Sequence, residues 1–303
     1  MSTNLRGIFA LLVVTLVWGT TFPAMKDLSS SFSPAWIIFL RFFLATIILA
    51  PFLWRIRKQD LLIGLGMGFL LFLCYVFQVE GLALISSNRN AFITGLNVLI
   101  VPLLGILLGT WPEKRIVIAV VLAVIGLFAL CWEGGTWSFG DTLTLLCALC
   151  YAIYVKLMEV CSRRVSSLMS FTAAQITSVF LCALIWLLLA EIPLTSIVRE
   201  IDHTHYWQNI MRGISQHWIN IAYLGVICTA AIISLQTWGQ RHTTANEAAV
   251  IYAFEPACAA IAAYFWVGEK MTAWGVFGAI LMIIGMIVSQ WNPPAEKRAL
   301  VTD

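Results

Sequence analysis

The stretch Asn246–Glu269, NEAAVIYAFEPACAAIAAYFWVGE, decides the fold class of this chain. It is long and apolar enough to cross a bilayer as a helix, yet Glu255 and Pro256 stand near its middle. A carboxylate at that depth costs about 2.5–3.5 kcal/mol on insertion scales, so we expect it to face a protein partner or a water-filled cavity. Proline removes a backbone donor and predicts a bend at the same place.

An earlier stretch, Asn88–Glu113, has the sequence NRNAFITGLNVLIVPLLGILLGTWPE and repeats this pattern. Both stretches have a small polar start, a central polar residue, a proline and a terminal glutamate. Asn246 follows Asn88 by 158 positions, and Glu255 follows Asn97 by the same 158 positions. This spacing predicts that the chain consists of two copies of one unit.

The composition indicates a membrane protein along the whole length of the chain. Of its 303 residues, 61% are hydrophobic and 11% are charged, and the mean hydropathy is +0.91. Apolar runs of about 17–25 residues recur throughout, which is the pattern of transmembrane helices. The net charge is only +3 and no basic cluster indicates nucleic acid. We interpret Cys147 and Cys150 as small apolar residues of a span, and not as a redox or metal pair.

We predict an all-α polytopic membrane protein with ten transmembrane helices, the first of them a retained span and not a cleaved signal. The predicted spans cover residues of about 8–26, 34–54, 61–81, 87–109, 116–132, 141–158, 167–190, 216–238, 244–266 and 272–291. Two five-helix repeats follow, over 8–132 and 140–291, with a cytoplasmic tail over 292–303 and a solvated outer loop over 191–215.

Two observations set the orientation of these spans. The loops on the side of the N-terminus carry most of the lysines and arginines, which predicts that both termini are cytoplasmic. A unit with an odd number of spans enters the membrane from the opposite side when it is duplicated in tandem. The two repeats are therefore predicted to be inverted, an arrangement whose binding site lies near the midplane where the repeats meet.

Polar residues inside the predicted spans mark this site. Asn90, Thr94 and Asn97 follow the i, i+4, i+7 spacing of one helix face, and Tyr252 and Glu255 continue the pattern in the second copy. Two glutamines in neighbouring spans, Gln78 and Gln236, match under the same offset. We expect these residues to line a central cavity. The alternative for the amides is hydrogen bonding between helices.

Two further residues have two interpretations each. Arg41 lies about one-third of the way into the second span, where it either snorkels to the interface or attracts Glu255 or an anionic group inside the cavity. Trp18 lies within WGTTFP, Trp18–Pro23, where a glycine and a proline permit a kink. It is either a cavity or gate residue or ordinary packing.

Several motifs resemble the drug/metabolite transporter superfamily, specifically its EamA-like members with two EamA domains. These are WGTTFP, LRFFLA over 40–45, GLALISSNRNAFITGLNVLIVPLLG over 81–105, and the opening stretch with its EP…GE pattern. The resemblance covers about 8–291. The first copy departs from the pattern, since Asn97 stands in place of the glutamate and Pro102 lies four positions later than the offset predicts. The resemblance implies a ten-helix inner-membrane carrier of small metabolites that works by alternating access, often as an exporter.

We therefore expect a secondary transporter, with amino-acid-like export as the leading hypothesis, in a bacterial-type plasma membrane. Glu255 would exchange protons or contact a substrate amine. No cofactor or metal is expected, and no enzymatic motif is found. The alternatives are a lipid or undecaprenyl-type flippase, a membrane-embedded enzyme and a subunit of a larger complex. The oligomeric state is expected to be a monomer or a homodimer.

Overall fold

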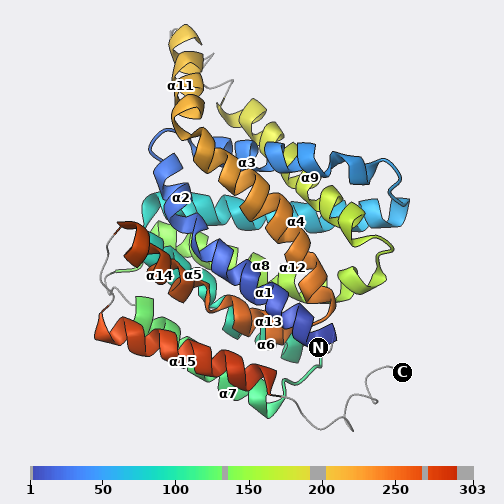
Figure 1. Cartoon of the computed structure of the whole chain (residues 1–303), viewed down its shortest axis with the longest axis vertical. Helices are drawn as coiled ribbons and strands as arrows, with labels where there is room; N and C mark the ends of the chain where they lie inside the picture. Colours follow the sequence, from blue (N-terminus) through green and yellow to red (C-terminus); the bar gives the residue numbers. More distant parts are fainter. Residues whose placement is uncertain (1–2, 132–135, 192–202, 268–271, 292–303) are drawn as a thin grey trace.

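The structure of this chain is a computed structural model that describes residues 3–131, 136–191, 203–267 and 272–291. The described part is helical and contains no strand, which confirms the all-α class (Figure 1). The predicted tail 292–303, Glu269 at the end of the opening stretch and residues 192–202 of the predicted loop lie outside these ranges.

The helices follow one another with short connections. In the first half of the chain they are α1 Thr3–Gly19, α2 Thr21–Leu28, α3 Pro34–Leu49 with the short 3₁₀ helix η1 Ala50–Leu53, α4 Lys58–Leu84, α5 Ser87–Gly95, α6 Asn97–Leu107 and α7 Lys114–Cys131. In the second half they are α8 Phe139–Arg164, α9 Leu168–Trp186 with the π-helical turn η2 Leu187–Glu191, α11 His203–Ala222, the π-helix η3 Tyr223–Ala231, α12 Ile232–Arg241, α13 Ala245–Tyr252, α14 Glu255–Val267 and α15 Ala273–Gln290.

Eight helices of the described residues are long and apolar enough to cross a membrane, so the protein is polytopic. They cover Asn4–Leu28, Pro34–Leu53, Lys58–Leu84, Asn88–Leu107, Phe139–Arg164, Leu168–Leu189, Tyr206–Arg241 and Ala273–Gln290. The other two predicted spans correspond to α7 and to α13 with α14. The number ten therefore stays a prediction.

The prediction of a loop over 191–215 is wrong from His203 onward, because α11 begins at this residue. Its sequence repeats apolar residues at helical spacing, and Ile210 is buried whereas Met211 is exposed. With η3 and α12 it forms one long helix, kinked at His217. A span of 36 residues, Tyr206–Arg241, is about 54 Å long and exceeds a hydrocarbon core of about 30 Å. In Figure 1, α11 accordingly projects beyond the other helices.

Capping motifs fix where two of the helices around the site begin. The side chain of Ser138 accepts a hydrogen bond from the backbone N–H of Asp141, whose carboxylate accepts one from the backbone N–H of Ser138. Thr244 and Glu247 form the same reciprocal pair at the start of α13. Each motif satisfies two backbone donors at a helix end, so α8 and α13 begin at defined residues.

Two spans of the bundle are interrupted near their middle. A turn at Leu96 separates α5 from α6, which begins at Asn97. A turn at Ala253 and Phe254 separates α13 from α14, which begins at Glu255. The central polar residue of each related stretch, Asn97 or Glu255, is therefore the first residue of a half-helix. At such a start, backbone N–H groups lack the carbonyl partners that a continuous helix would supply.

The helices form a closely packed bundle around α8. The pair α7 and α15 lies at one edge, while α4 packs against both α8 and α9, and α1 packs against α12, α13 and α14 (Figure 1). Small residues permit the closest approach. A Cβ added to Gly126 of α7 would lie 2.6 Å from the carbonyl oxygen of Gly278 of α15. The two backbones are thus in direct contact.

Candidate functional site

A cavity lies inside the bundle, between residues from both halves of the chain. About 40 Å³ is open to the centres of water molecules, which is room for a few waters. The residues that line it are Trp18, Thr21, Arg41, Leu71, Cys74, Tyr75, Gln78, Thr94, Cys147, Tyr151 and Glu255.

Helix α4 contributes one continuous face to the cavity. Leu71, Cys74, Tyr75 and Gln78 follow the i, i+3, i+4, i+7 spacing that brings side chains to one side of a helix. On α8, Cys147 and Tyr151 lie one turn apart on the facing side. The wall of the cavity therefore combines apolar, thiol, phenol and amide groups from two packed helices.

Arg41 is the cation of the cavity and is only 3% exposed. Its Nε donates a hydrogen bond to Thr229 Oγ1 at 2.5 Å, and its Nη2 donates one to the carbonyl oxygen of Cys228 at 3.3 Å. The guanidinium also lies over the ring of Tyr75, 4.8 Å from the centroid. These partners are all neutral. A buried charge without a counter-charge is costly, so the site favours an anionic group near Arg41. Because the side chain of Arg41 is buried, it does not snorkel to the membrane interface, which was the other interpretation of this residue.

Glu255 is the carboxyl group of the cavity. It is half-buried and lies at the first position of α14, where the positive end of the helix dipole favours a negative charge. Its carboxylate makes no hydrogen bond or ion pair within the described ranges, although Arg41 lines the same cavity. The cavity thus holds one guanidinium and one carboxyl group, with no ion pair between them in the described residues.

Aromatic rings form a further wall. The ring of Trp18 lies 5.7 Å from that of Tyr252 and 6.2 Å from that of Tyr151. Its indole Nε1 donates to the carbonyl oxygen of Cys228 at 3.4 Å, which holds the ring in place. Tyr151 also lies 5.9 Å from Tyr252. This cluster joins α1 to α8 and α13 beside the two charged groups.

The structure divides the residues predicted for the site into two groups. Trp18, Gln78, Thr94, Arg41 and Glu255 line the cavity. The remaining three lie behind it, in contact with residues that line it, and they are Asn97, Gln236 and Tyr252.

Each of these three is buried against a residue that lines the cavity. Asn97 donates from Nδ2 to the carbonyl oxygen of Thr94 at 2.9 Å, and Gln236 donates from Nε2 to the hydroxyl of Tyr151 at 3.2 Å. Tyr252 is 1% exposed, behind Trp18. The 158-residue offset therefore identifies matching positions, but it does not determine which side chain of each pair reaches the cavity.

Sequence reasoning missed Thr21, Leu71, Cys74, Tyr75, Cys147 and Tyr151. Three of these precede Gln78 at helical spacing, and this was a usable signal. Cys147 was interpreted only as a small apolar residue. It and Cys74 are free thiols, and both line the cavity. Tyr151 carried no signal of its own, because tyrosine is common in membrane spans.

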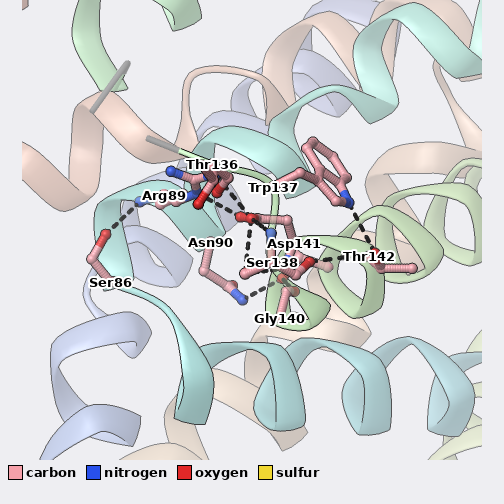
Figure 2. A network of polar contacts seen from close by, with 10 residues as sticks. Ser86, Arg89, Asn90, Thr136, Trp137, Ser138, Gly140, Asp141 and Thr142 are labelled. Atoms are coloured by element: carbon pink, nitrogen blue, oxygen red, sulfur yellow. Dashed lines mark hydrogen bonds and ion pairs between the residues drawn. The ribbon is translucent and has the colours of Figure 1, made fainter. Parts of the chain in front are cut away.

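A polar cluster closes one end of the bundle beside the cavity, where α5 meets the start of α8 (Figure 2). Arg89 forms an ion pair with Asp141, with Nε 2.5 Å from Oδ1 and Nη2 2.9 Å from Oδ2. The neighbouring Asn90 donates to Thr144 Oγ1 at 3.0 Å and to the carbonyl oxygen of Gln78 at 3.2 Å. The cluster therefore connects the first half of the chain to the second, one turn from a residue that lines the cavity.

A second polar cluster lies at the opposite end of α8. Arg115, at the start of α7, pairs with Glu247 of α13 at 3.2 Å and with Glu113 at 2.7 Å. Glu159 of α8 accepts a hydrogen bond from the backbone N–H of Ala245 at 3.1 Å. The Arg115–Glu247 pair again connects the two halves of the chain, and Glu159 holds the start of the same helix α13 from within the second half.

Interrupted helices, a central charged cavity and many membrane spans are features of transporters. Residues 5–132 and 138–290 match the EamA-like transporter family. The chain belongs to the EamA-like transporter family. It is therefore a multi-pass membrane protein of a transporter family, as the sequence resemblance predicted.

The chain is also similar to individual proteins over most of its length. One is an uncharacterized transporter of Archaeoglobus fulgidus, 28% identical over 92% of this chain and 83% of its own length. A second uncharacterized transporter of the same organism is 23% identical over 84% of this chain and 85% of its own length. A solved crystal structure has a TM-score of 0.71, with 15% identity and 99% coverage of both chains. This last likeness concerns the fold alone.

Proposed function

We propose that this protein is a secondary active transporter that opens the central cavity to each side of the membrane in turn. The observation that carries the proposal is the position of the cavity along α8. Asp141 and Glu159 are 18 residues apart on this helix, about 27 Å. Asp141 pairs with Arg89 of the first half, and Glu159 holds the start of α13, where Glu247 pairs with Arg115 of the first half. Each therefore belongs to a polar cluster at the boundary between the two halves. Cys147 and Tyr151, which line the cavity, lie between them. Release of one cluster while the other is kept would open one side only.

The proposed architecture is ten crossings in two inverted repeats, over 8–132 and 140–291. Support comes from the helix boundaries, since α5 and α13 begin 158 positions apart, and α6 and α14 also begin 158 positions apart. The distribution of lysine and arginine supports cytoplasmic termini, with the 292–303 tail on that side, and a location in the plasma membrane.

The proposed substrate is a small zwitterion of the amino-acid type, moved outward. A carboxylate would bind Arg41, whose partners are all neutral, and an ammonium group would bind Glu255, whose carboxylate lacks a partner in the described chain. Trp18, Tyr75 and Tyr151 would contact the side chain of the substrate. Substrate can drive the change of conformation only if it binds the two states with different affinity. When the cavity closes, Arg41 and Glu255 would approach the charged groups of the substrate, and this would provide such a difference in affinity.

Protons are the proposed coupling ion, because Glu255 is the only carboxylate among the residues that line the cavity. A proton on Glu255 would compete with a substrate ammonium group for the same oxygens, which couples their movements. This competition requires no contact between Glu255 and Arg41.

The test is counterflow in liposomes with labelled amino acids, for wild type, Glu255→Gln and Glu80→Gln. Glu80 is a half-buried carboxylate on α4 that does not line the cavity, so it controls for loss of a membrane carboxylate. We expect exchange by wild type and by Glu80→Gln. Glu255→Gln is expected to lose movement driven by a pH gradient. If folded wild type exchanges no amino acid, the substrate proposal fails. If Glu255→Gln responds to pH as wild type does, the coupling role fails.

A further inference from the structure

An apolar groove on the outside of the bundle has no role in the proposed transport cycle. It runs between α1 and α12 and has a volume of about 330 Å³. Its lining residues are Arg6, Phe9, Ala10, Val13, Leu235 and Trp238. The four residues of α1 follow the i, i+3, i+4, i+7 spacing of one face, so the groove is a continuous strip along that helix.

The groove exists because the two helices cross at glycines. A Cβ added to Gly7 would lie 3.1 Å from the carbonyl oxygen of Gly239, and one added to Gly239 would lie 3.2 Å from that of Gly7. The backbones therefore touch at this point. Helices that touch at one point diverge on either side of it, which leaves space between their side chains.

The position of the groove relative to the bilayer follows from the two spans. Arg6 lies near the start of the span Asn4–Leu28, and Trp238 lies near the end of the span Tyr206–Arg241. Both span ends lie at the same membrane boundary, because α1 and α12 pack against each other there. From Arg6 to Val13 the groove descends about 10 Å into the membrane.

The chemistry of the groove changes along this path. Arg6 is exposed and has no hydrogen bond or ion pair among the residues that the structure describes. The other residues that line the groove are apolar apart from the indole N–H of Trp238. Phe9 is 62% exposed, and the ring of Trp238 is held 4.7 Å from that of His242. One cation at the membrane boundary and apolar walls below it would complement a molecule that has an anionic headgroup and an apolar chain.

We propose that this groove binds an anionic phospholipid from the leaflet on the side of the N-terminus. The phosphate would pair with Arg6, and one acyl chain would occupy the strip between Phe9, Val13 and Leu235. Basic sites between membrane helices bind acidic lipid headgroups in this way, and the charge and the apolar walls together favour a lipid over a soluble anion. The bound lipid would bridge α1, which carries Trp18 of the cavity, and α12.

The test measures the melting temperature of the purified full chain in micelles, with added phosphatidylglycerol or phosphatidylcholine of identical acyl chains. We expect saturable stabilisation of wild type by phosphatidylglycerol that exceeds the effect of phosphatidylcholine by several degrees. Arg6→Gln is expected to abolish the difference between the two lipids. Arg55→Gln is the matched control, since Arg55 is an exposed arginine outside the groove that also lacks a described partner.

Three outcomes would overturn the proposal. The first is a preference for phosphatidylglycerol that persists in Arg6→Gln. The second is an equal loss in Arg55→Gln, which would indicate attraction to surface charge in general. The third is equal stabilisation of wild type by glycerol phosphate, which would identify a site for a soluble anion. Because Arg6 is exposed, Arg6→Gln is expected to fold, and its melting temperature without lipid checks this. The readout does not depend on transport, so failure of the transport proposal leaves it interpretable.

Discussion

Arg89 and Asp141 are joined by two parallel contacts, Nε to Oδ1 at 2.5 Å and Nη2 to Oδ2 at 2.9 Å, across the boundary between the two halves of the chain. The side chain of Asp141 is fully buried and also accepts hydrogen bonds from the backbone and the hydroxyl of Ser138. A paired geometry of this kind is strong and directional. It fixes α5 against the start of α8 beside the cavity.

Arg89→Gln is expected to destabilise the bundle, because it leaves the buried carboxylate of Asp141 with Ser138 as its donor. Removal of one partner of a buried ion pair lowers the free energy of unfolding by up to about 3–5 kcal/mol. Because Arg89 is partly exposed to solvent, we expect a smaller loss here. The measurement is thermal unfolding of Arg89→Gln, Asp141→Asn and the double variant. A coupling energy near zero in this cycle would contradict the role of the pair.

Tyr151→Phe is expected to impair transport more than it impairs stability. It removes the hydroxyl that accepts from Gln236, and one such hydrogen bond contributes about 1 kcal/mol. Tyr154→Phe is the matched control, since its fully buried hydroxyl donates to Gln175 at 2.9 Å and it does not line the cavity. Both variants should lose similar stability, whereas only Tyr151→Phe should change exchange in liposomes. Equal exchange by the two variants would exclude Tyr151 from the site.

The sequence predicted the class of the fold because apolar length and composition determine it directly. The bend in the second stretch was predicted from Pro256, and the chain turns at Ala253 and Phe254 just before it. The turn at Leu96 was not predicted, because Pro102 of the first stretch lies inside α6. The part of α11 before residue 216 was not predicted as helix, because it has no long apolar run. Its amphipathic period was present in the sequence but resembled a polar loop.

The site was predictable only at the level of helix faces. Gln78 and Thr94 line the cavity, whereas Gln236 and Tyr252 lie behind it. The difference depends on how far each helix is rotated about its axis, and rotation is set by packing between helices that are distant in sequence. Periodicity within one helix contains no information about that rotation.

Gly126→Ala is expected to destabilise the bundle, because the new Cβ would lie 2.6 Å from both the carbonyl oxygen of Gly278 and Cγ of Met282. Overpacking of this kind costs about 1–3 kcal/mol. Gly66→Ala is the control, since its Cβ would meet nothing within 4 Å and alanine favours the helix by up to about 1 kcal/mol. Melting temperatures should therefore move in opposite directions. A stable Gly126→Ala would mean that α7 and α15 separate without cost.

Arg41→Lys is expected to weaken substrate binding although it keeps the positive charge. Lysine lacks the planar fork that lets Arg41 donate to Thr229 and to the carbonyl oxygen of Cys228 at once while it lies over Tyr75. Its ammonium group would therefore settle in a different position, and a substrate carboxylate would meet it at a changed distance. We expect the KM of exchange to rise about 10-fold, equal to about 1.4 kcal/mol, with a smaller change in maximal rate. Lys26→Gln is the comparison, because Lys26 donates to the carbonyl oxygen of Leu82 at 3.0 Å and does not line the cavity. If Arg41→Lys and Lys26→Gln keep the same KM, Arg41 holds helices together and does not bind substrate.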